Sequence, residues 1–118
     1  MTPNELIARL ECFAKSALTA SRALLHNSET MDMARQFRRA ATGAYMNYAA
    51  ASNGRSHRDF TAKLGVASEE ADECCRWARL ITHVNATAFS AAPSLIAEAG
   101  ELRAILRAAY LTARGNQQ

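Results

Sequence analysis

The sequence predicts an all-α protein folded as an antiparallel up-and-down four-helix bundle. Apolar residues recur at alternating intervals of three and four in four long segments, which is the spacing of one helix face. Proline and glycine are scarce, with two and five copies in 118 residues, and no segment alternates long enough to indicate a strand. Short polar breaks separate the segments, so we expect one domain over residues 1–118 with consecutive helices as antiparallel neighbours.

The first helix is expected over residues 3–26. Thr2 and Glu5 match a capping box, and Pro3 suits the first helical position. The apolar residues of its stripe are Leu6, Leu10, Phe13, Ala17, Ala20 and Leu24. The polar run from His26 to Ser28 then ends the helix.

The second helix begins after Thr30, whose hydroxyl is expected to cap it. It ends at Asn53 and Gly54, because both residue types tolerate a positive φ. Its stripe is rich in alanine, which lets neighbouring helices approach closely: Met33, Phe37, Ala40 or Ala41, Ala44, Tyr48 and Ala51. Asn47 lies at the edge of this stripe, so we expect its buried amide to bond to the third helix or to a neighbouring subunit.

The third helix carries two apolar rows. Ser56 supplies the cap and Asp59 an acid in the first turn. The first row has heptad-like spacing and consists of Phe60, Leu64, Ala67, Ala71, Cys74, Ala78 and Ile81. The second row, beside it, consists of Val66, Trp77 and Leu80. Because one bundle needs only one row, the second row predicts a contact with another copy of the chain.

The pattern breaks from His83 to Ala92, and Pro93 restarts a fourth helix that ends at Gly115. The stripe of this helix consists of Leu95, Ala99, Leu102, Ile105 or Leu106, and Ala109. The charged residues expected to face water are Glu98, Glu101, Arg103 and Arg107. Residues 116–118 are expected to form a frayed tail.

Catalytic and metal-binding motifs are not found. The three cysteines form no Cys-x-x-Cys pair, and the three histidines are not spaced as metal ligands. We therefore expect no disulfide, no metal and no cofactor. Arg76 and His83 match the Arg-x(6)-His spacing of helical ribonucleases of the HEPN class, but about one such match is expected by chance in a chain so rich in arginine. An enzyme is accordingly the third alternative.

Charge is unevenly distributed along the chain, whose formal net charge is +3. Six Lys or Arg residues and one acid lie in residues 35–63, and four acids follow in residues 69–73. Folding the second and third helices into a hairpin is expected to place Arg35, Arg38 and Arg39 beside these acids. The two groups would then neutralise each other.

Arg55, Arg58 and Lys63 remain around the turn after this pairing. Their charge would lie at the exposed end of the hairpin, where repeated copies in an oligomer would form a basic ring. Such a ring can hold a phosphate backbone without reading its sequence. The alternative is a solvated hairpin tip without a ligand.

Part of the chain matches a family pattern. Over residues 33–81 the matching residues are Gln36, Arg39, Asn47, Tyr48, Ala51, Arg55, Ser56, Asp59, Phe60, Ala62 to Gly65, Glu69 to Glu73 and Trp77. The pattern resumes at Glu98 to Leu102, Ile105, Leu106 and Thr112 to Arg114. With these residues the chain resembles the four-helix-bundle family related to proteins encoded in the intervening sequences of bacterial large-subunit ribosomal RNA genes. It is distantly similar to the accessory variability protein of diversity-generating retroelements.

The resemblance implies an antiparallel four-helix bundle assembled into a ring, often a pentamer, without an established enzymatic activity. The retroelement protein is a basic ring that contacts nucleic acid and a reverse transcriptase. The chain departs from the family pattern in several places. Ala50 replaces a glutamate that is usual there, Tyr45 and Met46 replace smaller residues, and Arg79 stands where an acid is common.

These observations predict a non-catalytic homo-oligomer that binds RNA or DNA through Arg55, Arg58 and Lys63. The residues expected to contact another helix or another subunit are Asn47, Glu70, Glu73 and Trp77. The alternative is a structural or protein–protein interaction oligomer without a nucleic-acid role. No apolar run approaches the roughly 18 residues of a membrane span and no signal segment opens the sequence, so the chain is expected to be soluble and cytoplasmic.

Overall fold

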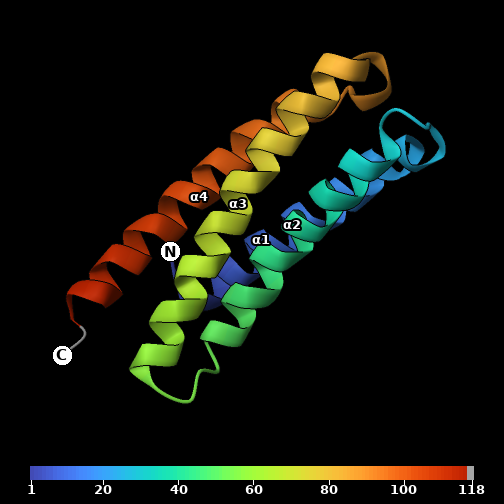
Figure 1. The fold of residues 1–118 in the computed structure, drawn as a ribbon. Coiled ribbons are helices and arrows are strands. Elements are labelled where there is room, and N and C mark those ends of the chain that lie inside the picture. Colours follow the sequence, from blue (N-terminus) through green and yellow to red (C-terminus); the bar gives the residue numbers. More distant parts are fainter. Residues whose placement is uncertain (117–118) are drawn as a thin grey trace.

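The computed structural model describes residues 1–116, which form a bundle of four antiparallel α-helices (Figure 1). Two short 3₁₀ helices lie between them, and no strand occurs in this part of the chain. In chain order the elements are α1 (Pro3–Ser21), η1 (Arg22–His26), α2 (Met31–Ala51), α3 (His57–Asn85), η2 (Thr87–Phe89) and α4 (Ala92–Gly115). The predicted fold class is therefore confirmed.

The helix α3 packs along α2 on one side and along α4 on the other, and α1 lies against α2 and more lightly against α4. The bundle is elongated, with dimensions of 48 × 22 × 19 Å. The predicted apolar stripes form its core, since the first row of α3 is buried from Leu64 to Ile81 and Phe60 packs partly buried against it. The second row remains outside this core, apart from Trp77, which is partly buried.

The start of α1 is confirmed and its end is corrected. Thr2 Oγ1 accepts from the Glu5 amide and Glu5 Oε1 accepts from the Thr2 amide, each at 3.1 Å. The α-helix stops at Ser21, and residues 22–26 continue as a 3₁₀ helix. Arg38 of α2 explains this change, because its guanidinium donates to the Leu18 carbonyl at 2.7 Å. The Arg22 amide therefore bonds to Thr19, one residue closer than in an α-helix.

The expected cap of α2 is wrong. The Thr30 side chain makes no cap bond, and its hydroxyl donates instead to the Leu24 carbonyl at 2.8 Å. Thr30 is fully buried, so its hydroxyl must find a partner inside the protein. The 3₁₀ segment before it supplies that partner.

The turn between α2 and α3 lies where it was predicted, but for a different reason. None of the described residues has a positive φ. The Gly54 amide donates to the Ala51 carbonyl at 2.9 Å. A β-carbon at Gly54 would lie 3.0 Å from that carbonyl oxygen and 3.2 Å from an Asp59 oxygen. Glycine therefore fits this close contact, in which a β-carbon would require its neighbours to shift.

The helix α3 begins as expected, with Ser56 Oγ accepting from the Asp59 amide at 3.1 Å. It runs to Asn85, further than the break expected from His83. The following segment is not merely a connection, because Phe89 of η2 is 1% exposed and meets Phe37 edge-to-face, with ring centroids 5.4 Å apart. Phe89 closes the core at this end of the bundle.

The helix α4 begins at Ala92, ends at Gly115 as predicted, and has Asn116 as its C-cap. Gln117 and Gln118 of the expected frayed tail lie outside the described residues. No helix of the described chain is both long and apolar enough to cross a membrane.

Candidate functional site

The three basic residues predicted at the hairpin tip differ in their surroundings. Arg55 and Arg58 are exposed, and neither forms an ion pair with a described carboxylate. Lys63 Nζ lies 2.6 Å from Asp59 Oδ1, one helical turn away. The hydrogen bond from Lys63 lowers the pKa of Asp59, so the carboxylate stays charged. The positive charge of the tip therefore comes mainly from Arg55 and Arg58.

The structure adds Arg114 of α4 to the basic residues predicted at the tip. His57 Nε2 lies 2.8 Å from the Ala113 carbonyl oxygen, to which a protonated Nε2 donates. This bond joins the first turn of α3 to the last turn of α4. Arg114, directly after Ala113, is exposed at the same end of the bundle. The signal in the sequence was an arginine in the last turn of a helix expected to be antiparallel to α3.

The predicted neutralisation between α2 and α3 is wrong for Arg35 and Arg38. Arg35 pairs with Asp32 on its own helix at 3.2 Å, and Arg38 donates to the end of α1. In the described chain, no ion pair joins Arg35, Arg38 or Arg39 to the acids of residues 69–73. Asp72 instead faces α4. Only Arg39 remains near one of these acids, since its charge acts on Glu70, although the two side chains form no ion pair.

Gly43 links two of the predicted contact residues. A β-carbon at Gly43 would lie 2.6 Å from Glu70 Oε2, so the Glu70 carboxylate packs directly on the α2 backbone. Asn47 Nδ2 donates to the Gly43 carbonyl at 2.8 Å. The bond from Asn47 to the third helix, one of the two options expected, is therefore replaced by a bond within α2.

Glu70 lies in an environment that disfavours its charged form. Burial raises the pKa of Glu70, the charges of Glu73 and Glu69 raise it further, and Arg39 opposes them. Glu73 itself is exposed one turn further along α3. The predicted acids at this position thus form a crowded negative cluster beside the α2 surface.

Large apolar side chains lie around this cluster, four of them exposed and one, Trp77, partly buried. We call them the α2–α3 face: Met46, Val66, Trp77, Leu80 and Val84. Met46 lies one turn from Gly43, and Val66 lies one turn from Glu70, so both flank the contact between the two helices. Met46 is 61% exposed and Leu80 is 52% exposed. Trp77 is partly buried against the core.

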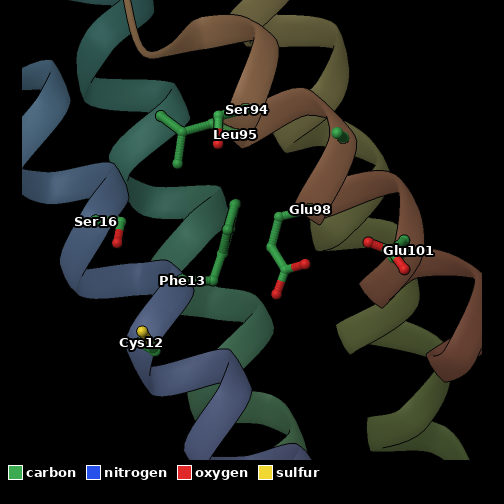
Figure 2. A pocket seen from close by; sticks show the side chains of 8 residues that line it. Cys12, Phe13, Ser16, Ser94, Leu95, Glu98 and Glu101 are labelled. Atoms are coloured by element: carbon green, nitrogen blue, oxygen red, sulfur yellow. The ribbon is translucent and has the colours of Figure 1, made fainter.

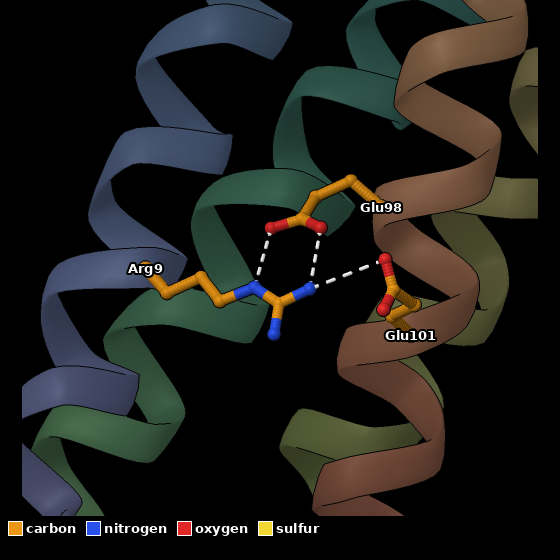
Figure 3. Close-up of polar contacts among 3 residues, drawn as sticks. All are labelled: Arg9, Glu98 and Glu101. Carbon is orange, nitrogen blue, oxygen red and sulfur yellow. Dashed lines mark hydrogen bonds and ion pairs between the residues drawn. The ribbon is translucent and has the colours of Figure 1, made fainter. Parts of the chain in front are cut away.

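A pocket of about 390 Å³ lies between α1 and α4 (Figure 2). Cys12, Ser16 and Ser94 are possible nucleophiles at its edge, but no histidine lines it. Glu98, expected to face water, is instead partly buried and bound by Arg9 of α1, whereas Glu101 is exposed as expected and also pairs with Arg9, at 3.3 Å (Figure 3). Both carboxylate oxygens of Glu98 accept from Arg9 at 2.7 Å, so this acid is not free to act as a base.

The other chemical candidates are equally limited. Arg76, half of the Arg-x(6)-His match, pairs with Asp72 at 3.0 Å. No group of three or more His, Cys, Asp or Glu side chains within residues 1–116 is arranged to hold a metal ion. Cys74 is buried, and burial raises the pKa of its thiol, which opposes formation of a reactive thiolate.

Comparison with known proteins identifies one family. The model of the 23S rRNA-intervening sequence protein family matches residues 8–108. A solved structure from Bacteroides thetaiotaomicron, described as a protein with unknown function from the S23 ribosomal protein family, superposes with a TM-score of 0.80. The two chains share 22% sequence identity over 89% of this chain and 97% of the other, which shows a common fold. No curated protein matches the sequence.

Proposed function

The chain belongs to the 23S rRNA-intervening sequence protein family, and from this premise we propose that it is a non-catalytic, ring-forming helical bundle that binds RNA or DNA at its basic tip. The ring is the first part of this proposal. The observation that carries it is the α2–α3 face, which exposes large apolar side chains at spacings of whole helical turns. Large apolar side chains that gather on one exposed face often mark a contact with a partner.

The nucleic-acid part of the proposal rests on the tip. Arg55 and Arg58 are exposed and lack a described carboxylate partner, and Arg114 lies at the same end of the bundle. In a closed ring each copy adds these arginines to one rim. Guanidinium groups bind phosphate oxygens through two parallel hydrogen bonds, and such contacts are independent of base sequence.

The absence of catalysis is also part of the proposal. The pocket between α1 and α4 lacks a histidine, and its main carboxylate is engaged by Arg9. A nucleophile without a neighbouring base is weak at neutral pH. We therefore expect no hydrolytic activity from the purified chain.

Two measurements test the proposal. Light scattering should give a mass several times that of one chain. A generic oligonucleotide should be retained at low salt and released as the salt concentration rises, because binding to phosphate releases counterions. The Arg55→Gln/Arg58→Gln variant should lose most of this retention.

A matched control uses the pair at the same tip. In Asp59→Asn/Lys63→Gln one acid and one base are removed together, so the net charge of the tip is unchanged. This variant should retain the oligonucleotide as the original chain does. A monomeric mass would refute the ring, and no retention at low salt would refute nucleic-acid binding.

The alternative function is a structural or protein–protein interaction oligomer. It is favoured by the pairing of Lys63 with Asp59, which reduces the charge of the tip. The acids Glu69, Glu70 and Glu73 near the apolar face also suit a protein partner. An oligomeric mass without oligonucleotide retention would favour this function.

A further inference from the structure

Two arginine-bearing stripes face each other across the outer side of the contact between α3 and α4. On α3 the residues at spacings of four and three are Gly65, Glu69, Asp72, Arg76 and Arg79. On α4 they are Arg103, Arg107, Tyr110 and Arg114. Spacings of four, three and four keep each set on one side of its helix. We call the surface between them the arginine groove.

Direct contacts fix the register of the two stripes. The Tyr110 ring packs against Gly65, where a β-carbon would lie 3.0 Å from ring atom Cε1. Arg103 Nε lies 3.9 Å from Asp72 Oδ1. Further along, Cys75 Sγ lies 3.7 Å from the Ile96 carbonyl. Burial raises the pKa of the Cys75 thiol, whereas the charges of Arg79 and Arg103 lower it, so both arginines act on this cysteine. The arginines therefore share one groove although they are far apart in the sequence.

The charge of the groove is strongly positive. It contains five arginines and two acids, and the three charges left over equal the net charge of the whole chain. Asp72 is shared between Arg76 and Arg103. Arg79, Arg107 and Arg114 form no ion pair with any carboxylate of residues 1–116. The rest of the chain is thus neutral in sum, and its excess charge lies here.

The groove is shaped and partly preorganised. Its central part is a hollow of about 250 Å³, lined by Ser68, Glu69, Asp72, Arg76, Arg103 and Arg107. The guanidinium of Arg107 lies 5.7 Å from the centroid of the Tyr110 ring, in the range of a cation–π contact. Because Gly65 lets this ring lie close to α3, Arg107 is held over the groove.

We propose that the arginine groove holds the phosphodiester backbone of RNA or DNA. This inference rests on the proposed nucleic-acid binding and extends the contact from the tip along α3 and α4. From Gly65 to Arg79 the α3 wall is about 21 Å long at 1.5 Å per residue, enough for several phosphates of one strand. The hydrogen bond between His57 and Ala113 joins α3 to α4 at the end of the groove that lies nearest to Arg58 and the tip.

The test measures the binding of a fluorescently labelled single-stranded RNA, and of DNA of the same sequence, between about 50 and 200 mM NaCl. Each phosphate contact to a single strand contributes about 0.7 to the slope of log affinity against log salt. Arg103→Gln/Arg107→Gln should therefore bind more weakly and reduce the slope by about 1.4. The matched control, Arg22→Gln/Arg35→Gln, removes two exposed arginines elsewhere and should leave slope and affinity unchanged.

A second variant covers the case in which the first one does not fold. The helical circular dichroism signal reports whether each variant is folded. Arg76→Gln/Arg79→Gln removes the two groove arginines of α3, which lie away from the tip, and it should weaken binding to a similar extent. If both groove variants bind as the original chain does while Arg55→Gln/Arg58→Gln does not, the groove is refuted and the proposed function stands.

The original chain also decides between nucleic acid and an acidic protein. If it binds neither RNA nor DNA at low salt, the proposed function fails and the groove proposal fails with it. If it binds polyglutamate through Arg103 and Arg107 but not the oligonucleotides, the groove takes an acidic protein, and this inference is overturned. Binding of both nucleic acids with the expected loss of slope supports it.

Discussion

The carboxylate of Glu70 occupies the space that a β-carbon at Gly43 would need, with Oε2 2.6 Å from that position. The glycine therefore determines where the carboxylate of a partly buried acid lies. The same glycine supplies the carbonyl that Asn47 binds. This small contact lies in the middle of the apolar face through which we propose that copies of the chain associate.

Gly43→Ala should change assembly more than it changes the stability of one chain. The atoms in the way belong to the flexible end of Glu70, which can turn outward, and alanine favours a helix over glycine by about 1 kcal/mol. We expect the free energy of unfolding to change by less than about 1 kcal/mol, while light scattering reports weaker association. In Gly100→Ala nothing lies within 4 Å of the new carbon, so this control should be more stable and should assemble normally.

The raised pKa of Glu70 predicts a pH dependence of stability. Burial, its largest cause, makes the folded chain hold this proton more tightly than the unfolded chain. The carboxylate therefore destabilises the fold once the pH is above the folded-state pKa, and this penalty disappears as the pH falls through that value towards the ordinary 4.5.

Glu70→Gln removes this titration. Urea midpoints should show the variant to be more stable than the original chain at neutral pH, with the difference vanishing in acid. Glu29→Gln, at an exposed position, should not change the midpoint. A constant difference between the Glu70 variant and the original chain at all pH values would show that charge is not the cause.

The clamp between Arg9 and Glu98 is expected to stabilise the contact of α1 with α4. Its two hydrogen bonds of 2.7 Å are bidentate, and both side chains are less than a third exposed. A double-mutant cycle with Arg9→Ala and Glu98→Ala should give a coupling of about 1 kcal/mol, the upper part of the range for surface pairs. The exposed pair of Arg35 and Asp32 should show no measurable coupling in the same experiment. Equal couplings would mean that the clamp geometry adds nothing.

The sequence predicts those features of the fold that depend on residues close together in the chain. The caps at Thr2 and Ser56 need only residues three apart, and the buried rows follow from helical periodicity. It does not predict features that depend on a group from another part of the chain. The end of α1 depends on Arg38 from the next helix, and Thr30 bonds to the Leu24 carbonyl in the 3₁₀ segment that follows this end. The arginine groove depends on how α3 and α4 are rotated relative to each other. The apolar pattern of one helix does not reveal this rotation.

The burial of Phe89 in the core is also not predicted by the sequence pattern. It lies in a short 3₁₀ segment, where periodicity gives no signal, yet it is almost fully buried against Phe37. Phe89→Ala should cost about 3–5 kcal/mol in unfolding free energy, because it leaves a cavity. Phe89→Leu retains most of the volume and should cost less than about 1.5 kcal/mol. Val84→Ala, at an exposed neighbour, should have little effect on a chain kept dilute enough to be monomeric.

Leu80 and Leu111 offer a direct test of which face associates. Both are exposed leucines, 52% on α3 and 48% on α4, but only Leu80 lies on the α2–α3 face. A glutamate at either position is solvated in a single chain and should leave thermal stability almost unchanged. Within an apolar interface, however, the same carboxylate must be dehydrated, which strongly opposes burial. Leu80→Glu should therefore reduce the mass measured by light scattering to that of one chain, while Leu111→Glu keeps the oligomer. If Leu111→Glu dissociates the assembly and Leu80→Glu does not, the ring is built through α4, and the apolar row of α3 has another partner.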